Sequence, residues 1–344
     1  MAADAPGGER FVLVACDGGA RDALMPLAVA LDISLADVAS AECVDEVYWG
    51  RRFTESAATL LVVGTSDSVQ GRRVESAARR AARAAGLPIA AIEDFPGNYF
   101  DVPDGEATLV LAESAQAHAL CAQKLGNSAP RVEILSPARY DVYRAKLGAL
   151  RSATELHWHA DDPHVPRVLW AGQPETGDCL HTLEALIPAL RATGAKLILK
   201  AHPRDPGYAG GDYQKLLADA AIACEDVTMT SVADALAGGP RLVVTQFSSV
   251  AIEAGFHGIP GLCVLLPGAG GTRLREKKGY DVPPFCTAGA LAYVTCVEEV
   301  QRSFTRALLD SNYRADLLRC FDSYFQVRAC SIDTLVRFTQ SISM

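Results

Sequence analysis

The sequence predicts an α/β protein with two parallel-sheet domains. Short apolar runs alternate with segments of helical composition along most of the chain. This alternation is typical of strands joined by helical crossovers, which build doubly wound parallel sheets. A chain of 344 residues is also too long for one ordinary core and suits two domains of roughly 150 residues each.

The first half of the chain carries a series of apolar runs. They predict strands at 11–15, 45–49, 60–63, 89–92, 109–112 and 132–134. Helices are predicted at 23–31 and 70–85, and the second should stop at Gly86 and Pro88, because glycine ends helices and proline prevents their continuation. Parallel strands end at one edge of a sheet, so the polar residues that follow these strands should gather there.

The second half repeats the alternation after a polar stretch at 140–166. We place the domain boundary within that stretch, which gives domains 1–150 and 151–344. The second series predicts strands at 168–171, 196–200, 242–245 and 261–266, with helices at 180–192, 213–223 and 250–257. Both halves are therefore expected to have a Rossmann-like architecture.

Composition and charge exclude several classes of protein. With 49% hydrophobic and 21% charged residues, the chain reads as a soluble globular protein. The formal net charge of -9 argues against a nucleic-acid partner, which would require a basic face. No apolar stretch reaches membrane-spanning length, and the first residues lack the features of a secretory signal. Ten scattered cysteines without a C-x-x-C pair indicate reduced core thiols and a cytoplasmic location.

The segment after the predicted strand at 242–245 carries the strongest functional signal. Gln246, Ser248 and Ser249 lead into a predicted helix, and Glu253 follows about one turn later. Backbone N–H groups and two hydroxyls at a helix start suit a phosphate, while the carboxylate suits a ribose hydroxyl pair. Simple N-capping by Ser248 or Ser249 is the alternative.

A histidine follows the predicted strand at 196–200 on the same edge of the sheet. His202 precedes Pro203 and Arg204. A histidine at this position can donate to a nucleotide phosphate or protonate a leaving phosphate, because its pKa lies close to working pH. Alternatively, His202 and Arg204 belong only to a turn that two prolines dominate.

Together these two segments resemble the nucleotide-binding half of GT-B glycosyltransferases. The His202-Pro203 pair and the later Ser248-Ser249 pair, each after a strand, are similar to the motifs of bacterial sialyl-, polysialyl- and capsule-type transferases. The non-hydrolysing UDP-N-acetylglucosamine 2-epimerases share the frame but carry Ser-Gly-Gly where this chain has Ser248-Ser249-Val250. The resemblance therefore favours a transferase over an epimerase.

The resemblance implies two Rossmann-like domains that face a cleft, with the C-terminal domain binding the nucleotide sugar. By analogy, His202 contacts the donor phosphate, the Ser248 and Ser249 hydroxyls bind it, and Glu253 holds the ribose. The donor would be a CMP- or UDP-linked sugar, used as substrate without a cofactor or metal. An acidic nonulosonic-type sugar fits the serine pair.

The loop after the first strand of the second series also resembles one that approaches the nucleotide in such folds. Gly172 and Gln173 occupy it, followed by Pro174. An ordinary glycine-proline turn is the equally simple alternative.

The N-terminal strand ends supply candidates for the acceptor side. The run that begins with Glu93 and Asp94 loosely resembles the acidic motif of those sialyltransferases, whose carboxylate is a general base. We expect Asp94 to be the base, with Glu93 as the substitute; bracing the loop before Asn98 is the alternative. Further acceptor-side candidates, which otherwise form tight turns, are Asp17, Gly18, Thr65, Ser66 and Asn98.

Two clusters of charged or metal-ligand-type side chains are expected to be solvated surface. Residues 157–164 hold three histidines and two aspartates, and we read them as a solvated linker rather than a metal site. The arginine-rich helix over 72–83 is read as a solvated face, with peripheral contact to anionic lipid or an acidic acceptor as the alternative.

The sequence thus predicts a metal-independent, inverting glycosyl transfer from a nucleotide sugar to a hydroxyl of a glycan, lipid or protein acceptor. Two alternatives remain. One is a sugar-nucleotide epimerase or hydrolase on the same frame, and the other is a non-catalytic protein that binds nucleotide sugars as a partner subunit.

Overall fold

The computed structural model describes residues 10–35, 41–125, 130–134, 138–160 and 165–325. The chain divides into two compact units between Val142 and Tyr143. This division lies inside helix α5 (Ala138–Ala145), earlier than the 150/151 boundary expected from the sequence. The first unit is described over residues 10–142 and the second over 143–325.

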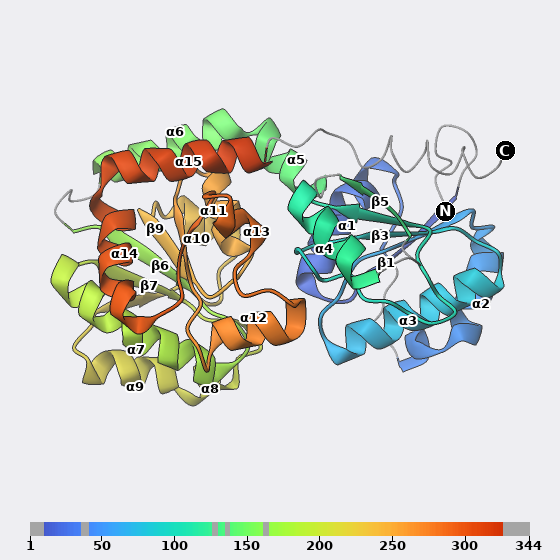
Figure 1. Cartoon of the computed structure of the whole chain (residues 1–344), viewed down its shortest axis with the longest axis horizontal. Coiled ribbons are helices and arrows are strands. Elements are labelled where there is room, and N and C mark those ends of the chain that lie inside the picture. The colour runs from blue at the N-terminus through green and yellow to red at the C-terminus, as the bar shows by residue number, and fades with distance from the viewer. Residues whose placement is uncertain (1–9, 36–40, 126–129, 135–137, 161–164, 326–344) are drawn as a thin grey trace. The chain divides into compact units, whose positions relative to one another are not determined.

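The first unit contains a five-stranded parallel sheet in which the strand order follows the chain (Figure 1). The strands are β1 (Phe11–Val14), β2 (Leu60–Val63), β3 (Ile89–Ile92), β4 (Leu109–Ala112) and β5 (Arg131–Ile134). The helices are α1 (Gly18–Ala30), the 3₁₀ helix η1 (Ala41–Val44), α2 (Glu46–Ser56), α3 (Val69–Ala84), α4 (Ala115–Leu125) and α5. Helices cover both faces of this sheet.

Alternating side chains of the strands build a separate apolar layer on each face. Leu13 and its neighbours on one face pack with Leu24 and Leu27 of α1. Val12 and its neighbours on the other face pack with Trp49 of α2 and with α3. Since both faces are buried, the strands read as unbroken apolar runs, which explains why the sequence located them.

One predicted strand is wrong. Residues 45–49 do not form a strand, because Asp45 caps α2 and its carboxylate accepts a hydrogen bond from Val47 N at 2.8 Å. Trp49 and Phe53, one helical turn apart, are both buried, whereas Val47 is 77% exposed. The burial period is therefore that of a helix, and the apolar run at 47–49 was too short to distinguish the two.

The second unit contains a six-stranded parallel sheet in the order β11-β10-β9-β6-β7-β8 (Figure 1). The strands are β6 (Arg167–Ala171), β7 (Lys196–Lys200), β8 (Cys224–Asp226), β9 (Leu242–Thr245), β10 (Gly261–Val264) and β11 (Ala292–Val294). The strand order reverses at β6, since β7 and β9 lie on opposite sides of it. Crevices that bind ligands form beyond the carboxyl ends of strands at such a reversal.

Helices enclose the second sheet. They are α6 (Leu147–Ala160), α7 (Thr176–Thr193), α8 (Pro206–Gly210), α9 (Asp212–Asp219), α10 (Val232–Ala237), α11 (Val250–Phe256), α12 (Gly270–Lys278), α13 (Pro284–Thr287), α14 (Val297–Leu309) and α15 (Ser311–Phe325). The strands predicted around 168–171, 196–200, 242–245 and 261–266 are confirmed. Among the described helices, none is long and apolar enough to span a membrane.

The arginine-rich helix α3 is only partly a solvated face. Arg79 is 1% exposed and donates to the carbonyls of Gly105 at 2.7 Å and Phe100 at 2.9 Å, and to the Tyr99 hydroxyl at 2.9 Å. Arg73 and Arg83 are exposed, as predicted. Arg79 therefore fastens the 99–105 loop to α3 rather than offering charge to a partner.

Replacing Arg79 should destabilise the first unit. Arg79→Met would leave two carbonyls and a hydroxyl without their donor, which costs about 3 kcal/mol in total. Arg73→Met, an exposed change on the same helix, is the control and should have almost no effect. Urea unfolding followed by circular dichroism tests this, and equal midpoints for the two variants would contradict the structural role of Arg79.

Candidate functional site

The loops that follow β6, β7 and β9 meet at the point where the second sheet reverses its order. Gly172 N donates to the Lys200 carbonyl at 2.9 Å, and a Cβ atom at Gly172 would lie 3.5 Å from His202 N. The Thr245 hydroxyl donates to the Ala171 carbonyl at 2.7 Å. The structure thus brings the predicted Gly172 and His202 loops together at the carboxyl edge.

His202 is held in one orientation by its own loop. Its Nδ1 accepts a hydrogen bond from Arg204 N at 3.1 Å, and its carbonyl accepts from Asp205 N at 2.9 Å. An accepting Nδ1 places the proton of the neutral imidazole on Nε2. His202 is therefore arranged as a donor through Nε2, whereas the Arg204 side chain is exposed.

Asp205, which the sequence did not single out, anchors the loop that carries His202. Its carboxylate accepts from the Thr176 and Tyr213 hydroxyls and from Gly207 N at 2.9 Å. Asp205 is 2% exposed, and Tyr213 is fully buried. Burial, above all, raises the pKa of the Tyr213 hydroxyl, so that it stays a donor. An aspartate before Pro206, the first residue of α8, was the available signal for this cap.

The two serines before α11 differ in their contacts. Ser248 N donates to the Thr245 hydroxyl at 3.2 Å, and the Ser248 Oγ accepts from Val250 N at 3.3 Å. Ser249 is the N-cap residue of α11 but its side chain makes no capping hydrogen bond. The simple capping interpretation therefore fits Ser248, while Ser249 does not serve its helix in that way.

Glu253 and Gln246 lie in different surroundings. The Glu253 Oε2 accepts from the Tyr143 hydroxyl at 2.6 Å, and the Tyr143 ring stacks on Phe256 at 5.4 Å between ring centroids. Gln246 is completely buried, and its Nε2 donates to the Thr182 hydroxyl of α7 at 3.2 Å. Gln246 thus braces α7 against the end of β9.

The Gln173 backbone is tied to a cysteine of α7. Gln173 N donates to Cys179 Sγ at 3.1 Å, and Cys179 Sγ donates to the Gln173 carbonyl at 3.3 Å. Burial raises the pKa of the Cys179 thiol to about 11, so it stays protonated and able to donate. The loop after β6 is therefore fixed through its backbone.

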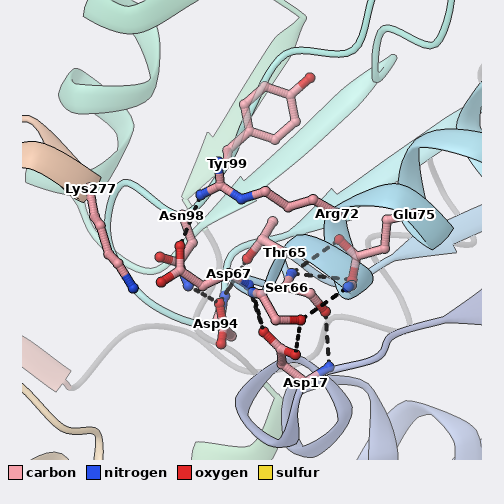
Figure 2. Close-up of polar contacts among 12 residues, drawn as sticks. Asp17, Thr65, Ser66, Asp67, Arg72, Glu75, Asp94, Asn98, Tyr99 and Lys277 are labelled. Atoms are coloured by element: carbon pink, nitrogen blue, oxygen red, sulfur yellow. Dashed lines mark hydrogen bonds and ion pairs between the residues drawn. The ribbon is translucent and has the colours of Figure 1, made fainter. Parts of the chain in front are cut away.

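In the first unit, Asp94 is the centre of a polar cluster at the carboxyl edge (Figure 2). Its Oδ1 accepts from the Thr65 hydroxyl at 2.8 Å and from Asn98 Nδ2 at 2.6 Å. A Cβ atom at Gly19 would lie 2.5 Å from Asp94 Oδ2, so Oδ2 faces the first turn of α1. Arg139 Nη2 donates to the Asp94 carbonyl at 2.6 Å. The carboxylate is thus held from several sides.

Glu93, the first residue after β3, differs from Asp94 in its surroundings. It is fully buried, and its Oε1 accepts from Tyr99 N at 3.0 Å. Asp94 keeps 9% of its surface exposed. Of the two carboxylates proposed as the base, Asp94 alone lies at the surface edge.

Asp17 and Ser66 hold two strand-end loops together (Figure 2). The Asp17 carboxylate accepts from Asp67 N at 2.8 Å and from Ser68 N at 2.7 Å, while the Ser66 Oγ accepts from Asp17 N at 3.0 Å. Gly18 is exposed at the start of α1. The tight-turn interpretation therefore accounts for the contacts of Asp17 and Ser66.

Among the described residues, no group of three or more histidine, cysteine, aspartate or glutamate side chains could hold a metal ion. The side chains of the cluster at 157–164, with the exception of Trp158, lie outside the described part of the structure.

Comparison with known proteins gives matches by structure. No protein-family model matches the chain, and no curated protein sequence matches it. Its structure is similar to that of S. aureus MnaA with UDP, with a TM-score of 0.62, 13% identity and 92% of each chain covered. It is also similar to UDP-GlcNAc 2-epimerase from Neisseria meningitidis bound to UDP-GlcNAc, with a TM-score of 0.58, 12% identity, and 92% of this chain and 89% of that chain covered.

A third similar structure is Anabaena HepE in complex with UDP and glucose. The TM-score is 0.59 at 14% identity, and the match covers 97% of this chain and 99% of that chain. These similarities establish the fold. The chain has the GT-B type of architecture, with two parallel-sheet α/β domains, that the sequence predicted.

The stability of the first unit should depend on pH through Glu75. This carboxyl is fully buried and accepts from Ser66 N at 3.0 Å. Burial raises its pKa from 4.5 to about 8. A raised carboxyl pKa means that the folded state binds the proton more tightly, so its contribution is complete below pH 4.5 and is lost as the pH rises through 8.

Glu75→Gln should therefore lose less stability than the wild type between pH 6 and pH 9. The amide still accepts from Ser66 N, and we expect the Tm at pH 9 to be several degrees higher, on the order of 2 kcal/mol. In this variant the loss of stability between pH 6 and pH 9 should be smaller but still present, because burial also raises the pKa of Glu113 to about 8. Exposed Glu55→Gln is the control, and parallel Tm curves for the wild type and both variants would refute the assignment.

Proposed function

We propose that this protein is a glycosyltransferase that transfers a sugar from a UDP-linked donor to an acceptor hydroxyl with inversion. The observation that carries the proposal is the restrained Asp94 carboxylate at the strand-end edge of the first unit. Its Oδ1 receives two hydrogen bonds, from Thr65 and Asn98, which fix the orientation of the carboxylate that would take the proton.

On the donor side, His202 is the main candidate for the phosphate. Its Nδ1 is used by Arg204 N, so the imidazole donates through Nε2. A hydrogen bond from Nε2 would stabilise the negative charge that develops on the departing diphosphate. Ser249, whose hydroxyl does not cap α11, would add a second donor, and Glu253 would hold the ribose.

The reaction is a direct displacement. The acceptor oxygen forms a bond to the anomeric carbon while the bond from that carbon to the phosphate oxygen breaks. The acceptor proton passes to Asp94, and the electron pair of the broken bond leaves on the nucleoside diphosphate. Attack from the face opposite the leaving group inverts the configuration.

UDP is placed ahead of CMP as the donor nucleotide for one reason. The similar structures of MnaA and of HepE were solved with UDP. The serine pair favours a CMP-linked acidic sugar, so we keep CMP as the competitor in the binding test.

An epimerase is the second candidate, and one observation favours it. The similar structure from Neisseria meningitidis is a UDP-GlcNAc 2-epimerase bound to UDP-GlcNAc. An epimerase would convert the nucleotide sugar without an acceptor, whereas the transferase requires one. Conversion of donor alone therefore separates them, and binding without any turnover would indicate a non-catalytic partner protein.

The nucleotide site can be tested by calorimetric titration with UDP, CMP, CDP and GDP. We expect UDP to bind, and His202→Ala and Ser249→Ala each to weaken it about tenfold, the loss of one charge-assisted hydrogen bond. His181→Ala, at an exposed histidine of α7, is the control. Binding that is absent, or unaffected by both substitutions, would remove the support for this site.

The base can be tested by Asp94→Asn. The amide keeps the shape of the side chain but cannot take a proton, so turnover with donor and a panel of glycan and lipid acceptors should fall by about 10²–10⁴. UDP affinity should stay unchanged. Asp104→Asn, an exposed change in the same unit, serves as the comparison, and turnover of Asp94→Asn within tenfold of wild type would assign the base elsewhere.

A further inference from the structure

Arginines gather at the amino-terminal edge of the second sheet, opposite the strand ends that carry the proposed donor site. Arg241 directly precedes β9, and Arg314 lies in the first turn of α15. Arg241 N donates to the carbonyl of Arg167, the first residue of β6, at 2.8 Å. Backbone pairing between β6 and β9 thus fixes the start of this edge.

Trp158 of α6 brings two of these guanidinium groups to one place. The Arg314 guanidinium lies over the Trp158 ring at 4.6 Å from the centroid. Arg241 Nη2 donates to the Trp158 carbonyl at 3.4 Å. The indole N–H of Trp158 donates to the Gly239 carbonyl at 3.1 Å, which fixes the ring. Two guanidinium groups are therefore held at Trp158, one over its ring and one at its backbone carbonyl.

Within the described residues, no carboxylate neutralises the positive charges of Arg241 and Arg314. Arg167 has its own counter-charge, since its Nη2 donates to Glu225 at 2.6 Å. Neither Arg241 nor Arg314 forms an ion pair with a carboxylate in the described residues. The Nε of Arg314 is buried and lacks a hydrogen-bond partner. Burial and then the charge of Arg241 lower the pKa of Arg314 to about 10.

An oxyanion would offset the excess of positive charge at this place. Its negative charge would offset the repulsion between the two guanidinium groups, and its oxygens would accept from the planar donors of arginine. Both arginine side chains are partly covered by the protein, which makes a bound anion more favourable there than at an exposed arginine.

We propose that Arg241, Arg314 and Trp158 form a binding site for the phosphate group of a small soluble metabolite, separate from the donor site. The side chains of Arg241, Arg314 and Trp158 are only partly exposed, and a free phosphate can approach them more closely than a headgroup held in a bilayer. The site lies at the opposite edge of the sheet from His202, so it would act as a second, non-catalytic position on this unit.

The test uses inorganic phosphate as the probe and the full-length chain at low ionic strength. Binding is measured by calorimetry and by tryptophan emission, since Trp158 lies in the site. We expect Arg314→Gln and Arg241→Gln each to weaken phosphate binding at least about tenfold. Arg319→Gln, at an exposed arginine of the same helix, should change it less than about twofold. Circular dichroism confirms that each variant is folded.

Three outcomes would overturn the proposal. The first is a wild-type protein that does not bind phosphate. The second is binding that His202→Ala abolishes and Arg314→Gln leaves intact, which would place the phosphate at the donor site. The third is Arg314-dependent sedimentation with phosphatidylglycerol vesicles, but not phosphatidylcholine vesicles, without binding of free phosphate, which would assign the site to a lipid headgroup.

Discussion

Parallel strand pairing is the constraint on which both candidate sites depend. Every strand pair in the two sheets is parallel, so the carboxyl ends of all strands in a sheet lie at one edge. Residues that are far apart in the chain therefore meet at this edge because their strands pair, and they need no direct contact with one another to be brought there. His202 and Gly172 become neighbours because β6 and β7 pair in register from Arg167 with Lys196 onwards. The same pairing leaves the opposite edge to the strand starts, where Arg241 lies.

The two proposed reactive groups share a second property, since each is restrained by side chains that do no chemistry. Thr65 and Asn98 fix the orientation of the Asp94 carboxylate. Asp205 fixes the loop that carries His202, through hydroxyl and backbone donors below it. A restrained donor or base loses little freedom on binding substrate, which favours the reactive geometry. In this fold, much of the precision of a site therefore resides in buried residues that a motif search ignores.

Whether an element of the fold could be predicted from the sequence depends on the contacts that its residues make. Most strands were predictable because burial on both faces leaves continuous apolar runs. Strand β8 was not, since its residues 224–226 are exposed and polar at the sheet edge. The helix at Glu46–Ser56 was missed because its only start signal is the capping residue Asp45. A single aspartate before a short apolar run does not distinguish a helix from a strand.

The positions of candidate site residues were predictable, but their orientations were not. Ser248, Ser249 and Gln246 all follow β9, and only the structure shows that Gln246 turns inward to Thr182. Likewise Glu93 and Asp94 are adjacent, and only the structure shows that Glu93 is fully buried and accepts from Tyr99 N. Arg139 escaped notice because its partner, the Asp94 carbonyl, is distant in sequence. Asp205 did offer a local signal, since it directly precedes Pro206 at the start of α8.

The two edges of the second sheet differ in whether charged side chains find partners within the protein. At the carboxyl edge, the Thr176 hydroxyl donates to the Asp205 carboxylate, so the loop that carries His202 is held without a ligand. At the amino edge, Arg241 and Arg314 repel one another and one guanidinium nitrogen has no acceptor. A loop that is held without a ligand suits the turnover proposed for His202, whereas two positive charges that only a bound anion offsets suit a ligand that stabilises the fold. Occupancy of the second kind adds stability in proportion to the logarithm of ligand concentration, which would couple the stability of this unit to the supply of phosphate.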